Sequence, residues 1–323
     1  MRAFVCAAIT EDWSGAALDR VPVPRIDANE ALVRVEAAAV NFPDLLMCQG
    51  KYQYKPAPPF IPGMEAAGEI VALGGDATDW KIGDKVAGGA RIGAFAEYLA
   101  LPAAALRRKP RKFDMAQAAA YGAAYLTAYV ALVRRGHLEA GETLLVHGAA
   151  GGVGLAAVDL GKLLGATVIA TASSEDKRAF LKAYGADHVL ESSGFREPVK
   201  DLSGGRGADV IYDPVGGDVF DESVRCIAFG GRLLIIGFTS GRIPSVSVNM
   251  PLIKGFSVVG VRAGEYGRQF PERGRENADA IWRMADEGRI RPHIHASLPL
   301  ERVHDAFALL SSRAVIGKVV VTP

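Results

Sequence analysis

The stretch Thr143–Leu164, TLLVHGAAGGVGLAAVDLGKLL, decides the fold of this chain. It begins with a short apolar run, Thr143–His147, which is typical of a buried β-strand. A glycine-rich turn, Gly148–Gly154, follows, and a pattern of helical period continues from it through Leu164. The order of strand, tight turn and helix predicts the first half of a βαβ unit.

The turn contains Ala149-x-Gly151-x-x-Gly154, a variant of G-x-G-x-x-G with alanine in the first place. In this context the motif is typical of dinucleotide-binding folds. Gly151 would let the backbone approach a pyrophosphate, Gly154 would permit close packing of helix on strand, and the N–H groups of the helix start would face the negative charge. A tight turn in another α/β fold is the alternative. The predicted contacts with the cofactor are Ala150, Gly151, Gly152, Val153 and Gly154.

Further apolar runs alternate with helical patterns after this unit, which predicts a parallel sheet with helices on both faces. The runs are Thr167–Thr171, His188–Leu190, Asp209–Tyr212, Arg232–Ile236 and Ser257–Val261. The first third of the chain instead carries short, turn-bounded strand patterns, which suit a small β-rich barrel or sandwich. After about residue 263 the polar content rises again. We therefore expect the tail to return to the first domain, with the nucleotide domain inserted between.

The end of the second parallel strand indicates which cofactor binds. An NAD site needs Asp or Glu there to hold the ribose 2′-OH, but the strand ends in Thr171-Ala172. Ser173, Ser174 and Lys177 follow, and these side chains suit the 2′-phosphate of NADPH. Helix capping by a Ser173-x-x-Asp176 box is compatible with this role. The sequence therefore favours NADPH over NADH.

Composition excludes several classes of protein. The chain has 323 residues, is 50% hydrophobic and carries a net charge of +1, which fits two globular domains and argues against nucleic acid or a membrane as partner. Cys6, Cys48 and Cys226 form no C-x-x-C pair, as expected in a reducing compartment. The uncharged stretch Met115–Val133 is rich in alanine and predicts a buried or interfacial helix of a soluble protein rather than a membrane span. The N-terminus is acidic too early for a signal peptide, so we expect a cytoplasmic protein.

Motifs along the whole chain carry a resemblance to a known family. Besides the glycine-rich turn, they are Asn41-Phe42-Pro43-Asp44, Gly50-Lys51-Tyr52, Pro59–Glu65, Gly83–Val86, Leu126–Tyr129, Tyr212–Gly216 and Gly317–Val320. With them the chain resembles the medium-chain dehydrogenase/reductase superfamily, and more narrowly its zinc-independent quinone oxidoreductase branch. The resemblance implies an α/β fold with a GroES-like β-rich catalytic domain in residues 1–123 and 263–323. It also implies an inserted Rossmann domain, a doubly wound parallel sheet that binds NADPH, in residues 124–262.

The resemblance also bears on zinc. Alcohol dehydrogenases of this superfamily place a cysteine ligand at the position of Asn41 and a histidine ligand at the position of Met64. Amide and thioether groups are poor zinc ligands compared with thiolate and imidazole. Cys48 has no second cysteine near it in the sequence, so we expect its thiol to be packed in the core rather than bound to a metal. We therefore expect no metal, and an acceptor that is already electrophilic without a Lewis acid.

Roles for individual residues follow from the same resemblance. Asn41 would bond the nicotinamide ribose or the substrate oxygen, Thr127 would meet the nicotinamide ring, and Gly237 and Phe238 would form a loop touching the cofactor. Tyr52 is the candidate proton donor, since its high intrinsic pKa suits a neutral acid. A stacking wall of the substrate pocket is the alternative role for Tyr52.

The leading hypothesis is an NADPH-dependent quinone reductase acting on a small electrophilic molecule. The alternative is an NADPH-dependent ene reductase for enones, alkenals or an α,β-unsaturated acyl-CoA, whose phosphates would need cations such as Lys51, Lys55 or Arg262. A third hypothesis is an NADPH-binding protein without catalysis. Members of the family are usually dimers, and the last apolar run of the parallel sheet, Ser257–Val261, could pair with its copy in a homodimer.

Overall fold

The computed structural model describes residues 1–323, which form two compact units. The first unit comprises residues 1–123 and 282–323, and the second comprises residues 124–281. The chain thus leaves the first unit once and returns to it, as expected for an inserted domain.

Six parallel strands form the sheet of the second unit in the order β10-β9-β8-β11-β12-β13. Because β8 is the first strand of the unit, this is the doubly wound order 3-2-1-4-5-6 of dinucleotide-binding domains. The strands are β8 (Thr143–Val146), β9 (Thr167–Ala172), β10 (His188–Glu191), β11 (Ala208–Asp213), β12 (Ile227–Ile235) and β13 (Ser257–Gly260). The predicted parallel sheet is confirmed, with every predicted apolar run on a strand.

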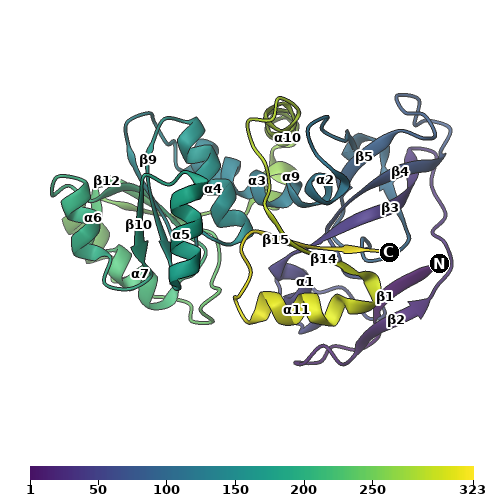
Figure 1. The fold of residues 1–323 in the computed structure, drawn as a ribbon, viewed down its shortest axis with the longest axis horizontal. Helices are drawn as coiled ribbons and strands as arrows, with labels where there is room; N and C mark the ends of the chain where they lie inside the picture. The colour runs from purple at the N-terminus through teal and green to yellow at the C-terminus, as the bar shows by residue number, and fades with distance from the viewer. The chain divides into compact units, whose positions relative to one another are not determined.

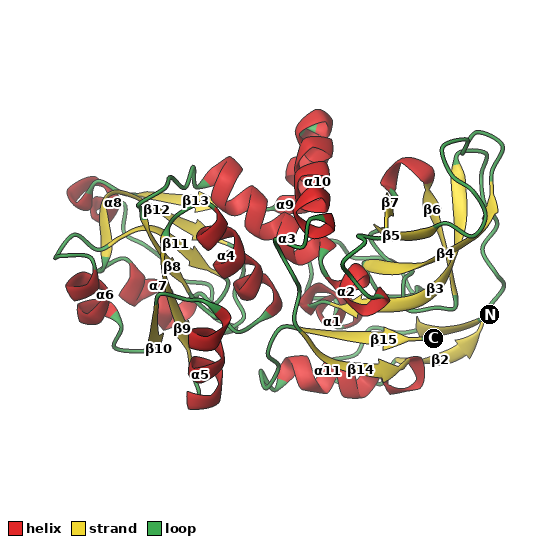
Figure 2. Cartoon of the chain, turned by 45° about the horizontal axis from the view of Figure 1, so that its top comes forward, coloured by secondary structure: helices red, strands yellow, loops and turns green.

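Helices cover both faces of this sheet, with α4 and α5 on one side and α6, α7 and α8 on the other (Figure 2). They are α4 (Gly152–Leu163), α5 (Glu175–Tyr184), α6 (Arg196–Leu202), α7 (Gly217–Ser223) and α8 (Asn249–Lys254). The central strands are apolar at nearly every position because neither face meets water. The four residues of β8, for example, are all buried.

The first unit contains a two-stranded ribbon, β1-β2, and a seven-stranded sheet in the order β14-β15-β3-β4-β5-β7, with β6 paired to β3. Figure 1 shows how β14 and β15 from the end of the chain lie beside β3 from its beginning. The strands are β1 (Arg2–Cys6), β2 (Ala16–Arg20), β3 (Glu30–Val40), β4 (Glu65–Leu73), β5 (Lys85–Gly89), β6 (Tyr98–Pro102), β7 (Arg107–Arg108), β14 (Ile294–Pro299) and β15 (Lys318–Thr322). Helices α1 (Phe42–Cys48), α2 (Met115–Ala120) and α11 (Val303–Ser311) complete this unit.

Two features differ from the sequence-based expectation. The stretch Met115–Val133 does not form one helix: α2 is followed by α3 (Gly122–Tyr129) and by a π-helical segment, Val130–Arg135. The return to the first unit lies at residue 282, within α10 (Pro271–Asp286), and not at residue 263. The reason is that α9 (Ala263–Gln269) and the start of α10 pack on the second unit. None of the helices combines the length and apolar character that a membrane span requires.

Candidate functional site

The glycine-rich turn connects β8 to α4. Gly148 has a positive φ of 53°, and Gly151 caps α4 with φ −78°. A Cβ on Gly154 would lie 2.4 Å from the carbonyl oxygen of Gly148 and 2.7 Å from the Cα of Ala149, so only glycine fits there. A Cβ on Gly151 would meet no atom closer than 3.4 Å. The fold itself thus requires glycine at 154 but leaves open space at 151, as expected where a ligand approaches.

The loops after β11 and β12 lie beside this turn at the carboxyl edge of the sheet. A Cβ on Gly148 would come within 3.3 Å of the Val215 side chain. The N–H of Thr239 donates to the Pro214 carbonyl at 3.1 Å, which ties the loop carrying Gly237 and Phe238 to the β11 loop. Since β8 and β11 flank the point where the strand order reverses, these loops border the position where such sheets bind ligands.

The end of β9 presents the side chains predicted to hold a 2′-phosphate. Ser173 and Ser174 are exposed, and Lys177 is partly buried, which lowers the pKa of its ammonium through desolvation. The Nη1 of Arg178 lies 3.4 Å from the Ala172 carbonyl and adds a second cation at this strand end.

The predicted cap at Ser173 is wrong by one residue. Ser174 is the N-cap of α5, and its hydroxyl accepts from the N–H of Lys177 at 3.4 Å. The third residue of the helix is Lys177, which cannot close a capping box. Because β9 continues through Ala172, Ser173 is left as the single residue between strand and cap. This position keeps the Ser173 hydroxyl available to a ligand.

His147, a buried residue directly after β8, makes hydrogen bonds to β9 and α7. His147 Nδ1 lies 2.9 Å from the hydroxyl of Thr171, and Nε2 lies 2.9 Å from that of Ser223. Ser223 donates its own proton to the Val219 carbonyl at 2.6 Å, so the hydrogen between His147 and Ser223 belongs to Nε2. Burial lowers the pKa of His147 to about 3, and the ring is neutral at physiological pH. His147 therefore joins the end of β9 to the end of α7 as a neutral ring.

The first unit contains a buried polar cluster formed by Asn41, Glu65 and Lys318. Strand register brings them together, because Val319 pairs with Val40 and Glu65 pairs with Ala39. The ammonium of Lys318 donates to Asn41 Oδ1 and, at 3.1 Å, to Glu65 Oε1. The side chains of Lys318 and Glu65 are each only 7% exposed, and Glu65 Oε2 accepts from the N–H of Ala123 at 2.7 Å. The cluster is thus a satisfied ion pair that holds one amide.

Asp44 extends the cluster through the backbone. It is fully buried, and its two carboxylate oxygens accept from the N–H groups of Asn41 at 2.8 Å and Gly63 at 3.2 Å. Desolvation raises the pKa of the Asp44 carboxyl to about 7, against the opposing effect of these hydrogen bonds and of the Lys318 charge. The nearby Glu65 charge acts in the same direction as desolvation.

This raised pKa predicts how Asp44 affects stability with pH. The folded carboxyl binds its proton more tightly than the unfolded one, so the native state holds more protons between about pH 4 and pH 7. The contribution of Asp44 to the free energy of unfolding therefore falls as pH rises through this window, by at most about 1.4 kcal/mol per pH unit. Asp44→Asn removes the titration. Urea unfolding of both proteins across the window should show the wild-type advantage shrinking with pH, and a constant or growing advantage would contradict the assignment.

Asn41 and Met64 stand at the two positions where the resemblance implies zinc ligands in the alcohol dehydrogenases. At the position of their cysteine ligand, Asn41 Oδ1 is engaged by the ammonium of Lys318, whose charge repels a metal cation. At the position of their histidine stands Met64, a partly buried thioether that packs against the core of the first unit. Cys48 is a buried free thiol, which fits the packing role predicted for it.

The other predicted residues are divided between the units. Tyr52 is half-buried and packs against the core of the first unit, while Thr127 lies partly buried on α3 in the second. Near Tyr52 in sequence, the guanidinium of Arg91 lies 4.9 Å from the centre of the Tyr54 ring. Glu65 and Lys318 were not predicted as functional residues, although both stand in quoted motifs. A charged residue at the start of an otherwise apolar buried strand, as in Lys318–Val321, was the available signal.

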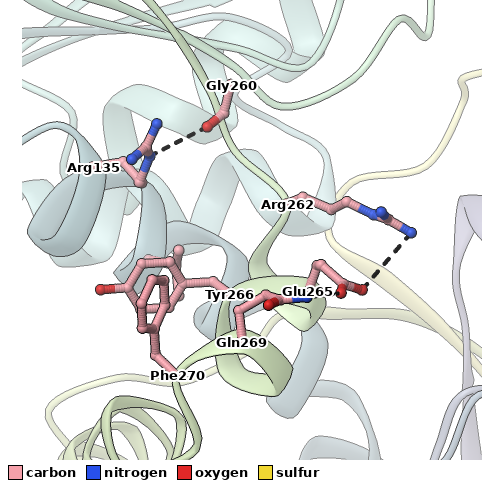
Figure 3. A pocket seen from close by; sticks show the side chains of 8 residues that line it. Arg135, Gly260, Arg262, Glu265, Tyr266, Gln269 and Phe270 are labelled. Carbon is pink, nitrogen blue, oxygen red and sulfur yellow. Dashed lines mark hydrogen bonds and ion pairs between the residues drawn. The ribbon is translucent and has the colours of Figure 1, made fainter.

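A pocket of about 200 Å³ lies in the second unit (Figure 3), and Arg262, one of the cations considered for an acyl-CoA, lines it. Its lining includes Arg135, which donates to the Gly260 carbonyl at 3.3 Å, and Arg262, which lies 4.0 Å from Glu265. The rings of Tyr266 and Phe270 close another side, with their centres 5.1 Å apart. None of the predicted cofactor contacts lines this pocket.

Comparison with known proteins agrees with this geometry. Residues 27–111 match the family described as alcohol dehydrogenase GroES-like domain, and residues 152–280 match the family described as zinc-binding dehydrogenase. The quinone oxidoreductase-like protein 2 homolog of Nematostella vectensis is 38% identical over 94% of this chain and 84% of its own length.

Two solved structures that contain NADPH also match over the full length of both chains. One is a mycobacterial protein, 29% identical with a TM-score of 0.91, and the other is the Escherichia coli quinone oxidoreductase, 27% identical with a TM-score of 0.91. The chain therefore belongs to the quinone oxidoreductase branch of the medium-chain dehydrogenase/reductase superfamily.

Proposed function

We propose that this oxidoreductase is an NADPH-dependent, zinc-independent reductase of electron-poor acceptors, most of all quinones. The observation that carries the proposal is the end of β9, where Ala172 stands in place of a carboxylate and Ser173, Ser174 and Lys177 follow. The NADPH complexes of the two similar structures support the same cofactor. The Asn41–Lys318 contact supports chemistry without a metal.

Different residues of the chain bind the different parts of NADPH. The open space at Gly151 and the start of α4 receive the pyrophosphate, and Ser173, Ser174 and Lys177 hold the 2′-phosphate. Thr127, Gly237 and Phe238 contact the nicotinamide half of the cofactor. NADPH, when bound, supplies the hydride that reduces the acceptor.

Tyr52 either donates a proton to the reduced acceptor or forms a wall of its pocket. A quinone favours the second role, because its reduction leaves oxygens that water can protonate. An enone favours the first, because a carbanion-like carbon needs a placed acid. Tyr52→Phe separates them, since it removes the hydroxyl and keeps the ring.

The surface cations of the chain favour a quinone over an acyl-CoA. A CoA thioester needs unpaired basic groups for its phosphates. Lys51 lies 3.4 Å from Glu11, and Arg262 lies 4.0 Å from Glu265, so two of the three candidate cations, all but Lys55, already have an acidic partner. A quinone carries no phosphate and therefore needs no unpaired basic groups.

Steady-state rates of NADPH oxidation with a naphthoquinone, an alkenal and crotonyl-CoA test the proposal. We expect the highest kcat/KM with the quinone, and little change in Tyr52→Phe. Preference for the alkenal or the thioester, with a large loss in Tyr52→Phe, would instead support the ene reductase. Tight NADPH binding without turnover on any acceptor would contradict both and support a binding protein.

Lys177→Met should reduce the preference for NADPH over NADH about tenfold, the effect of losing one charge-assisted contact with the 2′-phosphate. Binding of NADH should stay unchanged, because NADH lacks this phosphate. Fluorescence titration with both cofactors measures the ratio. Lys182→Met, on an exposed position of the same helix, is the matched control. An equal loss of NADH affinity in Lys177→Met would rule out the assigned contact.

We also propose a homodimer in which β13 pairs with its copy. This strand is at the edge of the parallel sheet, with Val258 40% exposed. Large exposed apolar side chains also stand on β12, which pairs with β13, and at α8, namely Phe229, Val248, Leu252 and Ile253. Such a patch on an open strand edge is typical of a self-complementary interface.

Val258→Lys should convert the dimer to a monomer, because a charge on an edge strand prevents strand pairing. Light scattering after size exclusion measures the mass. Ile82→Lys places the same charge on an exposed apolar residue of the first unit and should leave the dimer intact. A monomeric wild type, or dissociation by both variants alike, would overturn this interface.

A further inference from the structure

One carboxylate joins three helices of the second unit. Asp159 lies on α4, and its Oδ2 accepts from the hydroxyl of Tyr125 on α3 and, at 2.9 Å, from the hydroxyl of Tyr184 at the end of α5. Tyr125 is only 1% exposed, which leaves its hydroxyl no water in place of this acceptor. Desolvation raises the pKa of both phenols, so each keeps its proton and donates it. Hydrogen bonds to a carboxylate are stronger than those between neutral groups.

The three helices carry the residues proposed to contact three parts of NADPH. α4 begins directly after Gly151, the position proposed for the pyrophosphate. α5 begins directly after Ser174 and carries Lys177, and both are assigned to the 2′-phosphate. α3 carries Thr127, which is assigned to the nicotinamide ring. Since all these residues belong to the second unit, the Asp159 carboxylate connects the elements for both ends of the cofactor within one unit.

The same contact sets the rotation of α3 about its own axis. This short helix follows the end of α2 and continues into the π-helical segment Val130–Arg135, whose turns are wider than those of an α-helix. Neither end therefore holds α3 in one rotation by regular continuation. Residues two apart in a helix lie on different sides of it. The bond from Tyr125 to α4 thus fixes the direction in which Thr127 points.

We propose that Asp159 is a positioning residue that directs Thr127 at the nicotinamide ring through Tyr125, and holds α5 with its phosphate contacts to α4 through Tyr184. This inference rests on the proposed use of NADPH. It gives the two phenols different tasks, because each hydroxyl serves one end of the cofactor. A role in stability alone would make no such distinction.

The test compares binding of NADPH with binding of 2′,5′-ADP, which lacks the nicotinamide half. Tyr125→Phe removes one hydroxyl and keeps the ring. It should weaken NADPH about tenfold, the effect of losing one hydrogen bond to a charged group, and leave 2′,5′-ADP unchanged. Tyr184→Phe should weaken both ligands by the same factor, because both carry the 2′-phosphate.

Variants of Asp159 test whether the two phenols act through it. Asp159→Leu should combine both losses, and Asp159→Asn, which keeps an acceptor oxygen, should lose less. Adding Tyr125→Phe to Asp159→Leu should weaken NADPH no further, because the hydroxyl has already lost its partner.

Asp187→Asn is the matched control. Asp187 binds Lys162 near the end of α4 at 2.5 Å and the N–H of Val168 at 2.7 Å, at the amino edge of the sheet. No proposed cofactor contact lies on that edge, so the variant should change neither affinity.

Hydride transfer gives a second readout, which reduced stability would not move. In Tyr125→Phe the nicotinamide ring is less well directed, so hydride transfer should become slower and limit turnover more. The primary isotope effect with NADPH deuterated at the transferred position should therefore rise, and in Asp187→Asn it should stay at the wild-type value.

Affinities are measured by calorimetry below the melting temperature of every variant, and they decide the question even without turnover. Equal weakening of both ligands in Tyr125→Phe, or a loss no larger than that in Asp187→Asn, would overturn the positioning role. Additive effects of Tyr125→Phe and Asp159→Leu would do the same. Failure of the wild type to bind either ligand would contradict the proposed function itself, and is thus distinguishable from these outcomes.

Discussion

Gly154→Ala should weaken NADPH binding by about a hundredfold, or ~2.7 kcal/mol, and lower the free energy of unfolding by about 1–3 kcal/mol. The added methyl group would lie 2.4 Å from the Gly148 carbonyl oxygen and 2.7 Å from Ala149 Cα, both rigid backbone atoms. The turn must therefore move away from α4, which displaces the N–H groups that receive the pyrophosphate. Calorimetric titration and urea unfolding measure the two losses.

Gly151→Ala is the matched control, with the same added methyl group three residues earlier. The backbone there has φ −78°, and the nearest atom to the new Cβ is 3.4 Å away. We expect stability within about 0.5 kcal/mol of the wild type, together with a loss of NADPH affinity, since the methyl group fills the space for the pyrophosphate. Wild-type stability and affinity in Gly154→Ala would contradict the geometry of the turn.

Lys318→Met should lower the free energy of unfolding by about 3–5 kcal/mol. The substitution leaves the Glu65 carboxylate buried without its partner, and removing one member of a buried ion pair typically has this effect. Glu65 keeps only the N–H groups of Ala123 and Asn41, at 2.7 Å and 3.1 Å. Denaturant unfolding monitored by circular dichroism measures the change.

Lys85→Met serves as the control for this prediction. Lys85 joins Glu36 and Glu69 at the surface, where an ion pair contributes about 0–1 kcal/mol. Adding Glu65→Gln to Lys318→Met should restore part of the lost stability, because the buried charge is gone. A loss in Lys318→Met no larger than that in Lys85→Met would show that the cluster does not stabilise the first unit.

The sequence predicts the second unit well because its signals are local. Each parallel strand is a continuous apolar run, and the turn from Gly148 to Gly154 combines strand, glycines and helix within a dozen residues or so. The first unit is predicted less well. Its strands were expected only as short, turn-bounded segments, and their bounds, such as the end of β1 at Cys6 and the partly exposed strands β2 and β14, come from the structure.

No local sequence pattern could predict that the residues of the polar cluster lie in contact. Asn41, Glu65 and Lys318 meet only because β3 pairs with β4 on one side and β15 on the other, and strand register between distant segments is not written in any one motif. The predicted return to the first unit at residue 263 differs from the observed one at residue 282 for a related reason. Residues after 263 are polar, like those of the first unit, but Arg134 binds Glu276 and Asn277 and holds the start of α10 to the second unit.

We expect this protein to transfer a hydride from NADPH to an electron-poor acceptor without zinc. The most direct measurement is NADPH oxidation at 340 nm with a naphthoquinone, using protein stripped of metal by a chelator and checked for zinc by mass spectrometry. We expect turnover that chelation does not reduce and added zinc does not raise. Loss of turnover on chelation with recovery on adding zinc, or no oxidation of NADPH with the quinone at all, would contradict it.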